Sequence, residues 1–185
     1  MTGTVLLISG SLRSGSVNAA VLRTAQEVAP RGLATRFYAA MSELPHYNPD
    51  DDRDPLHPLV AALRQEIAQA DALLFSTPEY AGALPGSFKN LLDWTVGGAE
   101  MDGKPVGWIN AASPAAPAGG EDAYISLRKV LGYVGARIVE PACRRIPMSR
   151  QDVGPNGLIQ NRGIRDEIAV SLTALARELT NHDRG

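Results

Sequence analysis

The sequence has a single cysteine, Cys143, among 185 residues, which excludes an internal disulfide and a cysteine-based metal cluster. Its three histidines, His46, His57 and His182, lack the spacing of zinc ligands. A net charge of -2 gives no electrostatic basis for binding nucleic acid or an anionic membrane surface. No apolar run approaches the roughly 18 residues of a membrane helix, and no signal peptide is evident. We therefore expect a cytoplasmic enzyme or binding protein.

Short apolar runs alternate along the chain with segments of helical spacing. Five runs bounded by glycine, proline or polar residues predict buried strands, at 4–9, 33–39, 72–76, 106–112 and 136–142. Apolar residues that recur every three or four positions predict helices, around 17–29, 59–67, 88–95, 124–134 and 164–179. This alternation predicts one α/β domain over residues 1–185, a doubly wound sheet of five parallel strands in the order 2-1-3-4-5 with helices on both faces.

Ligands of such sheets bind beyond the carboxyl ends of the strands, where the strand order reverses. Three loops are predicted at that edge, at 10–18, 77–86 and 113–120. An acidic run elsewhere, Asp50, Asp51, Asp52 and Asp54, lacks the glycine-containing pattern of a calcium loop, so we expect a solvated loop and no metal site.

The first of these loops has the composition of a phosphate site. It leads into a helix, whose first N–H groups are unpaired and carry partial positive charge. The hydroxyls of Ser11 and Ser16, the guanidinium of Arg13 and the amide of Asn18 add donors. Ser16-Val17 stands where a nucleotide-triphosphatase loop needs Lys followed by Ser or Thr, so a monophosphate fits better than a triphosphate. The alternative is that Ser16 only caps the helix.

The other two loops favour a flat ring system. Tyr80 offers an aromatic face, and a backbone fixed by proline and glycine can present amides to a planar heterocycle. The third loop, 113–120, is apolar at its tip and able to close over a ring. Each loop alone is consistent with a plain connection. Together, a phosphate site beside a flat hydrogen-bonding surface indicates a pocket for flavin mononucleotide (FMN).

Three stretches, "GSLRSGSVNAAVL", "TPEYAGALPGSFKNLLDW" and "ASPAAPAGG", resemble the cofactor motifs of the NADPH-dependent FMN reductase family, which includes quinone, chromate and azo-dye reductases. The resemblance implies a flavodoxin-like fold, bound FMN, NADPH or NADH as electron donor, and a homodimer or homotetramer (a dimer of dimers). The sequence departs from the usual family pattern at Ala81, where Asn is usual, and at Ala115, where Gly is common. The cofactor-binding residues that it implies are Ser11, Arg13, Ser16, Val17 and Asn18 for the phosphate, and Pro78, Glu79, Tyr80, Ala81, Gly82 and Ser113 for the ring.

The expected function is an FMN-dependent oxidoreductase that passes electrons from NAD(P)H through FMN to a small acceptor, such as a quinone, free flavin, azo dye or metal oxyanion. Because the flavin supplies the chemistry, no side chain is assigned a catalytic role. The alternatives are a flavodoxin-type electron carrier and a non-catalytic flavin-binding regulatory protein.

A homodimer is also expected from the helix that follows the second loop. Its apolar side chains, Phe88, Leu91, Leu92 and Trp94, are more than a single buried stripe readily absorbs. A twofold interface would cover that surface and give the flavin a wall, with Glu79 or Tyr80 close to the neighbouring chain.

Overall fold

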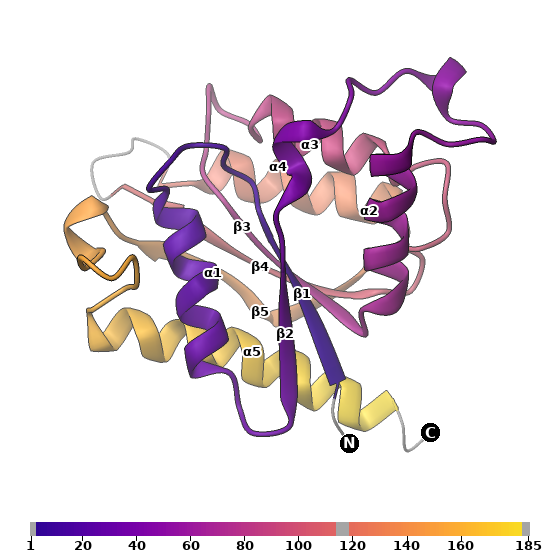
Figure 1. The fold of residues 1–185 in the computed structure, drawn as a ribbon. Coiled ribbons are helices and arrows are strands. Elements are labelled where there is room, and N and C mark those ends of the chain that lie inside the picture. Colours follow the sequence, from indigo (N-terminus) through magenta and orange to yellow (C-terminus); the bar gives the residue numbers. More distant parts are fainter. Residues whose placement is uncertain (1–2, 114–118, 183–185) are drawn as a thin grey trace.

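Five parallel strands form one sheet at the centre of the computed structural model, which describes residues 3–113 and 119–182 (Figure 1). The strands are β1 Gly3–Ser9, β2 Leu33–Tyr38, β3 Ala72–Thr77, β4 Pro105–Ala112 and β5 Arg137–Pro147. Their order is β2-β1-β3-β4-β5, which confirms the predicted order 2-1-3-4-5. The reversal between β1 and β3 puts the first and second loops next to each other at one edge of the sheet.

Helices cover both faces of the sheet, because neighbouring strand residues point in opposite directions and both sets are apolar. Leu6 and Ile8 of β1 pack toward α2, α3 and α4, whereas Val5 and Leu7 pack toward α1 and α5. None of the helices in the described part of the chain is both long and apolar enough to cross a membrane. The bounds are α1 Val17–Val28, α2 Pro58–Gln69, α3 Gly86–Asp93, α4 Glu121–Tyr133 and α5 Arg162–His182.

The apolar side chains of α3 and the residues after it belong to the core of this chain. Phe88, Leu91, Leu92 and Trp94 are each at most 1% exposed. The segment before α2 supplies the cover: Trp94 donates its Nε1–H to the carbonyl of Pro45 at 2.8 Å and meets the ring of Tyr47 edge-on. The inference of a subunit interface from their bulk is therefore wrong, since these side chains are already buried.

The acidic loop before α2 is also less solvated than predicted. Asp52 forms an ion pair with Arg64 at 2.7 Å, and the two side chains are only 7% and 10% exposed. Arg64 donates in addition to the carbonyl of Trp94. One carboxylate of the run thus fastens the loop to α2 and α3, instead of facing water.

The last strand runs five residues beyond its predicted end at Ala142. Its pairing with β4 slips: Val106 lies opposite Ile138, but Trp108 lies opposite Cys143. The extra residues of β5 form a bulge around Pro141, which has no N–H to give to a ladder. The alternating pattern is interrupted there, and this irregularity hid the second half of the strand from sequence reasoning.

Candidate functional site

A pocket of about 620 Å³ lies at the carboxyl ends of the strands, within the usual size range of roughly 300–1,000 Å³ for a small-molecule site. Four stretches of chain meet there: the first loop with the start of α1, the second loop, the end of β4, and the residues after β5. Its described lining is Ser11, Arg13, Gly15, Ser16, Val17, Asn18, Pro78, Tyr80, Ala111, Ser113, Met148, Ser149, Arg150 and Gln151. Eight of the predicted site residues are therefore brought together, and Glu79, Ala81 and Gly82 are not in the lining.

The first loop turns sharply from β1 into α1. Gly10 donates its N–H to Ser76 at 2.7 Å, and a Cβ at this position would come within 3 Å of Thr77 and Phe88. Only glycine allows this close approach between the first and second loops. The chain then reaches α1 through a turn in which the N–H of Ser16 donates to the carbonyl of Arg13.

Ser16 is the N-cap of α1: its Oγ accepts from the N–H of Asn18 at 3.2 Å. The capping role and the pocket-lining role coexist, because a hydroxyl that accepts one bond still has a proton to donate. Asn18 is 4% exposed, and its Oδ1 accepts from the hydroxyl of Ser76 at 2.9 Å. That bond orients the amide and leaves Nδ2 as the donor that Asn18 can offer.

The charge of the pocket favours an anion. Arg13 and Arg150 are exposed in its wall, and neither forms an ion pair within the part of the chain that the structure describes. The described lining residues include no aspartate or glutamate. The first turn of α1 has no acidic residue either, so its partial positive charge is not offset locally.

The second loop is a tight hairpin turn. Tyr80 and Ala83 exchange two backbone hydrogen bonds of 3.0 and 3.1 Å, and Ala81 and Gly82 between them have φ of 51° and 69°. Two consecutive positive φ values are the signature of a type I′ turn, which favours Asn-Gly. This geometry leaves Tyr80 about half exposed, at 52%, in the pocket wall.

Glu79 connects the second loop to α4. Its Oε2 accepts from the backbone N–H of Ala123 at 3.1 Å, at the amino end of α4. A carboxylate there satisfies an otherwise unpaired N–H and interacts favourably with the helix dipole. Glu79 therefore ties the second loop to the start of α4.

The third loop contributes Ser113 to the pocket, and its tip, residues 114–118, lies outside the described residues. Beneath it, Asn110 of β4 is 1% exposed and donates Nδ2–H to the carbonyl of Thr77 at 3.3 Å. Its Oδ1 has no hydrogen-bond partner among the described groups. The loop enters α4 through Gly119 and Gly120, both with positive φ.

Sequence reasoning missed the fourth wall, residues 148–151, because it ended β5 too early. A signal was available in Ser149 and Asp152, whose spacing matches a capping box. Residues 3–113 and 119–182 contain no cluster of three His, Cys, Asp or Glu side chains that could hold a metal ion.

A second hollow, of about 640 Å³, lies at the opposite ends of the strands. Its cations are largely engaged: Lys104 donates to the carbonyls of Ala68 and Ala70, and Arg137 forms an ion pair with Glu178. The lining also includes Asp71 and Asp102, so it lacks the one-signed character of the first pocket. The pocket at the carboxyl ends is thus the better candidate.

Comparisons with known proteins identify the family of this chain. The sequence model of a family described as NADPH-dependent FMN reductase matches residues 4–148. A quinone reductase of Escherichia coli strain K12 is 30% identical over 174 residues, and an NAD(P)H-dependent FMN reductase of Pseudomonas aeruginosa is 35% identical over 173, each match covering 92% of both chains. The solved structure of FerB, a flavoenzyme NAD(P)H:(acceptor) oxidoreductase of Paracoccus denitrificans, is similar with a TM-score of 0.84 and 27% identity, over 98% of this chain and 99% of that one. The chain therefore belongs to the NADPH-dependent FMN reductase family, as its motifs predicted, and is a flavodoxin-like oxidoreductase that passes electrons from NAD(P)H through FMN to a small acceptor.

Proposed function

We propose that FMN binds in the pocket at the carboxyl ends of the strands and that quinones are the acceptor. The observation that carries the cofactor placement is the grouping of an unpaired arginine, two serine hydroxyls and a helix amino end in one wall of that pocket. A phosphate monoester carries about -1.5 to -2 charge at pH 7 and three acceptor oxygens, which matches these donors.

The phosphate is assigned to the first loop. Arg13 supplies the positive charge, Ser11 and Ser16 supply hydroxyls, Asn18 supplies Nδ2–H, and the backbone at Val17 supplies a helix-terminal N–H. Ser16 and Asn18 are held by the bonds that they make to the start of α1 and to Ser76. Their donors are therefore fixed before the cofactor arrives, which lowers the ordering cost of binding.

The ring is assigned to the second and third loops. Pro78, Tyr80 and Ser113 line the pocket, whereas Ala81 and Gly82 form the tip of the turn and contribute backbone only. Glu79 is proposed to act indirectly, as a positioning residue that ties this turn to α4. Tyr80, half exposed, offers an aromatic face against which a planar ring or acceptor can stack.

When bound, FMN would supply the redox chemistry that links NAD(P)H to the acceptor. The side chains of this protein would bind and orient the ring, Pro78, Tyr80 and Ser113 from the lining of the pocket. No side chain is proposed to act as an acid or base. Quinones are proposed as acceptors because the Escherichia coli relative is a quinone reductase.

Two properties complete the proposal. A homodimer or a dimer of dimers is proposed from exposed aromatic and apolar side chains on the second loop and α4, namely Tyr80 at 52%, Ile125 at 56% and Tyr133 at 84% exposed. The cytoplasm is the proposed location, because NAD(P)H is the electron donor. Sedimentation at micromolar concentration tests the assembly, and a monomer with full activity would contradict it.

Arg13→Ala tests the cofactor placement. We expect FMN binding to weaken by about 1.5–3 kcal/mol, the scale of a hydrogen bond to a charged group, while binding of riboflavin, which has no phosphate, stays nearly unchanged. Titration of the apoprotein with each flavin, followed by quenching of flavin fluorescence, measures both affinities. Arg177→Ala is the matched control, since it removes the same charge from an exposed residue of α5 outside the pocket. Equal losses for FMN and riboflavin would place Arg13 away from the phosphate.

A further inference from the structure

The pocket has a fourth wall that none of the three motifs contains. It is formed by the residues that follow β5, where the N–H of Met148 donates to the carbonyl of Ala112 at 2.9 Å. This bond continues the pairing of β5 with β4 by one residue and places the next three, residues 149–151, at the pocket.

A capping box fixes the backbone around Arg150. The carboxylate of Asp152 accepts from the N–H of Ser149 at 2.8 Å, and the Oγ of Ser149 accepts from the N–H of Gln151 at 3.2 Å. The N–H of Gln160 then donates to the carbonyl of Asp152 at 3.0 Å. Arg150 thus stands on a short ordered turn, which reduces the backbone entropy that it would lose on binding a ligand.

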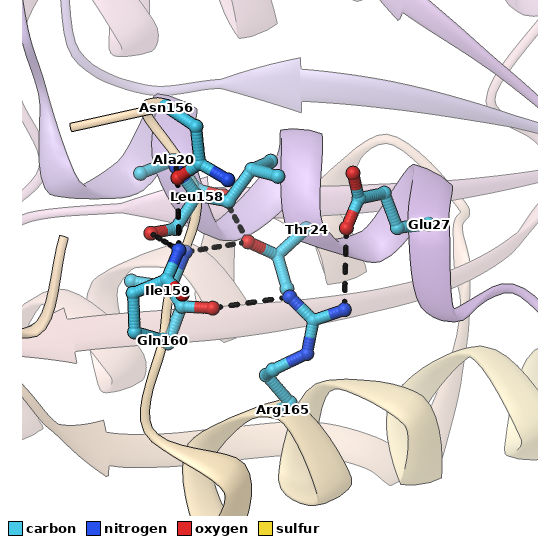
Figure 2. A network of polar contacts seen from close by, with 8 residues as sticks. All are labelled: Ala20, Thr24, Glu27, Asn156, Leu158, Ile159, Gln160 and Arg165. Carbon is cyan, nitrogen blue, oxygen red and sulfur yellow. Dashed lines mark hydrogen bonds and ion pairs between the residues drawn. The ribbon is translucent and has the colours of Figure 1, made fainter. Parts of the chain in front are cut away.

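The stretch that follows this turn, residues 156–160, is fastened to α1, the helix whose amino end carries the first loop (Figure 2). Thr24 of α1 is fully buried; its Oγ1 accepts from the N–H of Ile159 at 2.9 Å and donates to the carbonyl of Ala20 at 2.8 Å. Arg165 of α5 donates to the carbonyl of Ile159 at 3.1 Å and pairs with Glu27 of α1 at 3.2 Å. One helix therefore holds both Arg13, through the first loop, and Arg150, through this segment.

The positive charge of the fourth wall indicates that it binds an anionic group. Arg13 and Arg150 line the same pocket, and each lacks an ion pair within residues 3–113 and 119–182. A phosphate monoester at pH 7 carries nearly two negative charges, which one arginine and the partial charge of a helix end offset only in part. A second guanidinium, with its planar fork of donors, supplies the remainder.

We propose that Arg150 binds the FMN phosphate together with Arg13, and that the turn after β5 is a fourth cofactor-binding element of this protein. The proposal rests on the proposed placement of FMN in this pocket. It assigns a residue that neither the motifs nor the helix amino end predicts, on a segment held in position by Thr24 and by the capping box at Ser149.

The test is the affinity of Arg150→Met for FMN and for riboflavin, with Arg177→Ala as the control for loss of one positive charge. Methionine keeps the length of the aliphatic stem, so the turn and its burial are preserved. We expect FMN to bind roughly ten- to a hundredfold more weakly, riboflavin to change less than about twofold, and the control to leave both affinities unchanged.

Three other results would overturn the proposal. Equal losses for both flavins would mean that the turn only supports the ring. Unchanged flavin binding with a raised KM for NADPH, but not for NADH, would assign Arg150 to the 2′-phosphate of the donor. No change in any of these quantities would remove Arg150 from ligand binding altogether. Failure of the proposed cofactor placement is seen separately, as indifference of FMN affinity to Arg13→Ala.

Discussion

The hairpin turn of the second loop allows a stability prediction worked from one dihedral angle. Ala81 has φ of 51°, and no other non-glycine residue in the described part of the chain has a positive φ. A Cβ in the left-handed region costs roughly 1–2 kcal/mol, and asparagine recovers part of this cost through local hydrogen bonds of its side chain. Ala81→Asn should therefore raise the free energy of unfolding by about 0.5–1 kcal/mol, since it creates the Asn-Gly pair favoured in type I′ turns.

Ala81→Gly separates the dihedral effect from the side chain. Glycine removes the strain of roughly 1–2 kcal/mol but gains freedom in the unfolded chain worth roughly 0.5–1 kcal/mol, so we expect a net gain of about 0.5–1 kcal/mol, close to that for asparagine. The free energies come from urea unfolding with an unchanged m-value, and Tm should rise by about 1–4 °C for Ala81→Asn. Ala83→Asn, in the same turn but without a positive φ, should give no gain. If Ala81→Asn were neutral or destabilising, or if Ala83→Asn stabilised the protein equally, the strain argument would be refuted.

Three further predictions concern the supports of the site and the alkaline limit of the fold. Glu79→Gln keeps an acceptor for the N–H of Ala123 but loses the negative charge at the start of α4. The free energy of unfolding should therefore fall by about 0.3–1 kcal/mol, and FMN affinity should fall modestly. Urea unfolding measures the first effect, and a more stable variant would contradict the role given to Glu79. Thr24→Val leaves the buried N–H of Ile159 without its acceptor and should cost about 1–3 kcal/mol in urea unfolding, whereas Thr24→Ser should recover most of the loss; equal losses would point to packing instead. Burial raises the pKa of the Cys143 thiol from 9.0 to about 12, so the folded protein favours the neutral thiol. The stabilisation that this preference gives is complete below pH 9. It is lost as the pH rises toward 12, at up to about 1.4 kcal/mol per pH unit. Cys143→Ala should therefore reduce the slope of unfolding free energy against pH between pH 9 and pH 11. An unchanged slope would contradict the raised pKa of this thiol.

The layered sheet could be predicted from the sequence because each strand is a short apolar run between glycine, proline or polar residues. Leu6 and Ile8 face one layer of helices and Val5 and Leu7 the other, and this two-sided burial is what a continuous apolar run indicates. The first loop could be predicted in the same way, since a glycine, hydroxyls and an arginine between a strand and a helix supply the tight turn and the donors that a phosphate needs.

What the sequence did not reveal depends on contacts between distant segments. The apolar residues of α3 appeared to need a partner chain, but Trp94 is covered by Pro45 and Tyr47 from a loop with no clear pattern. The burial of Asp52 could not be predicted because its partner, Arg64, lies on α2, twelve residues later in the chain. The role of Arg150 was missed because a bulge around Pro141 interrupts β5. The stretch after its turn is held by Thr24, which bonds to Ile159 from more than a hundred residues earlier in the chain.

The most direct test of the central claim is rapid mixing of the FMN-loaded protein with NADPH in the absence of oxygen, followed by addition of a benzoquinone. Two-electron loss of the flavin absorbance without any other protein, and its return when the quinone is added, is the predicted result. A protein that binds FMN but is reduced by neither NADPH nor NADH unless a separate reductase is present would contradict it, and would identify an electron carrier instead.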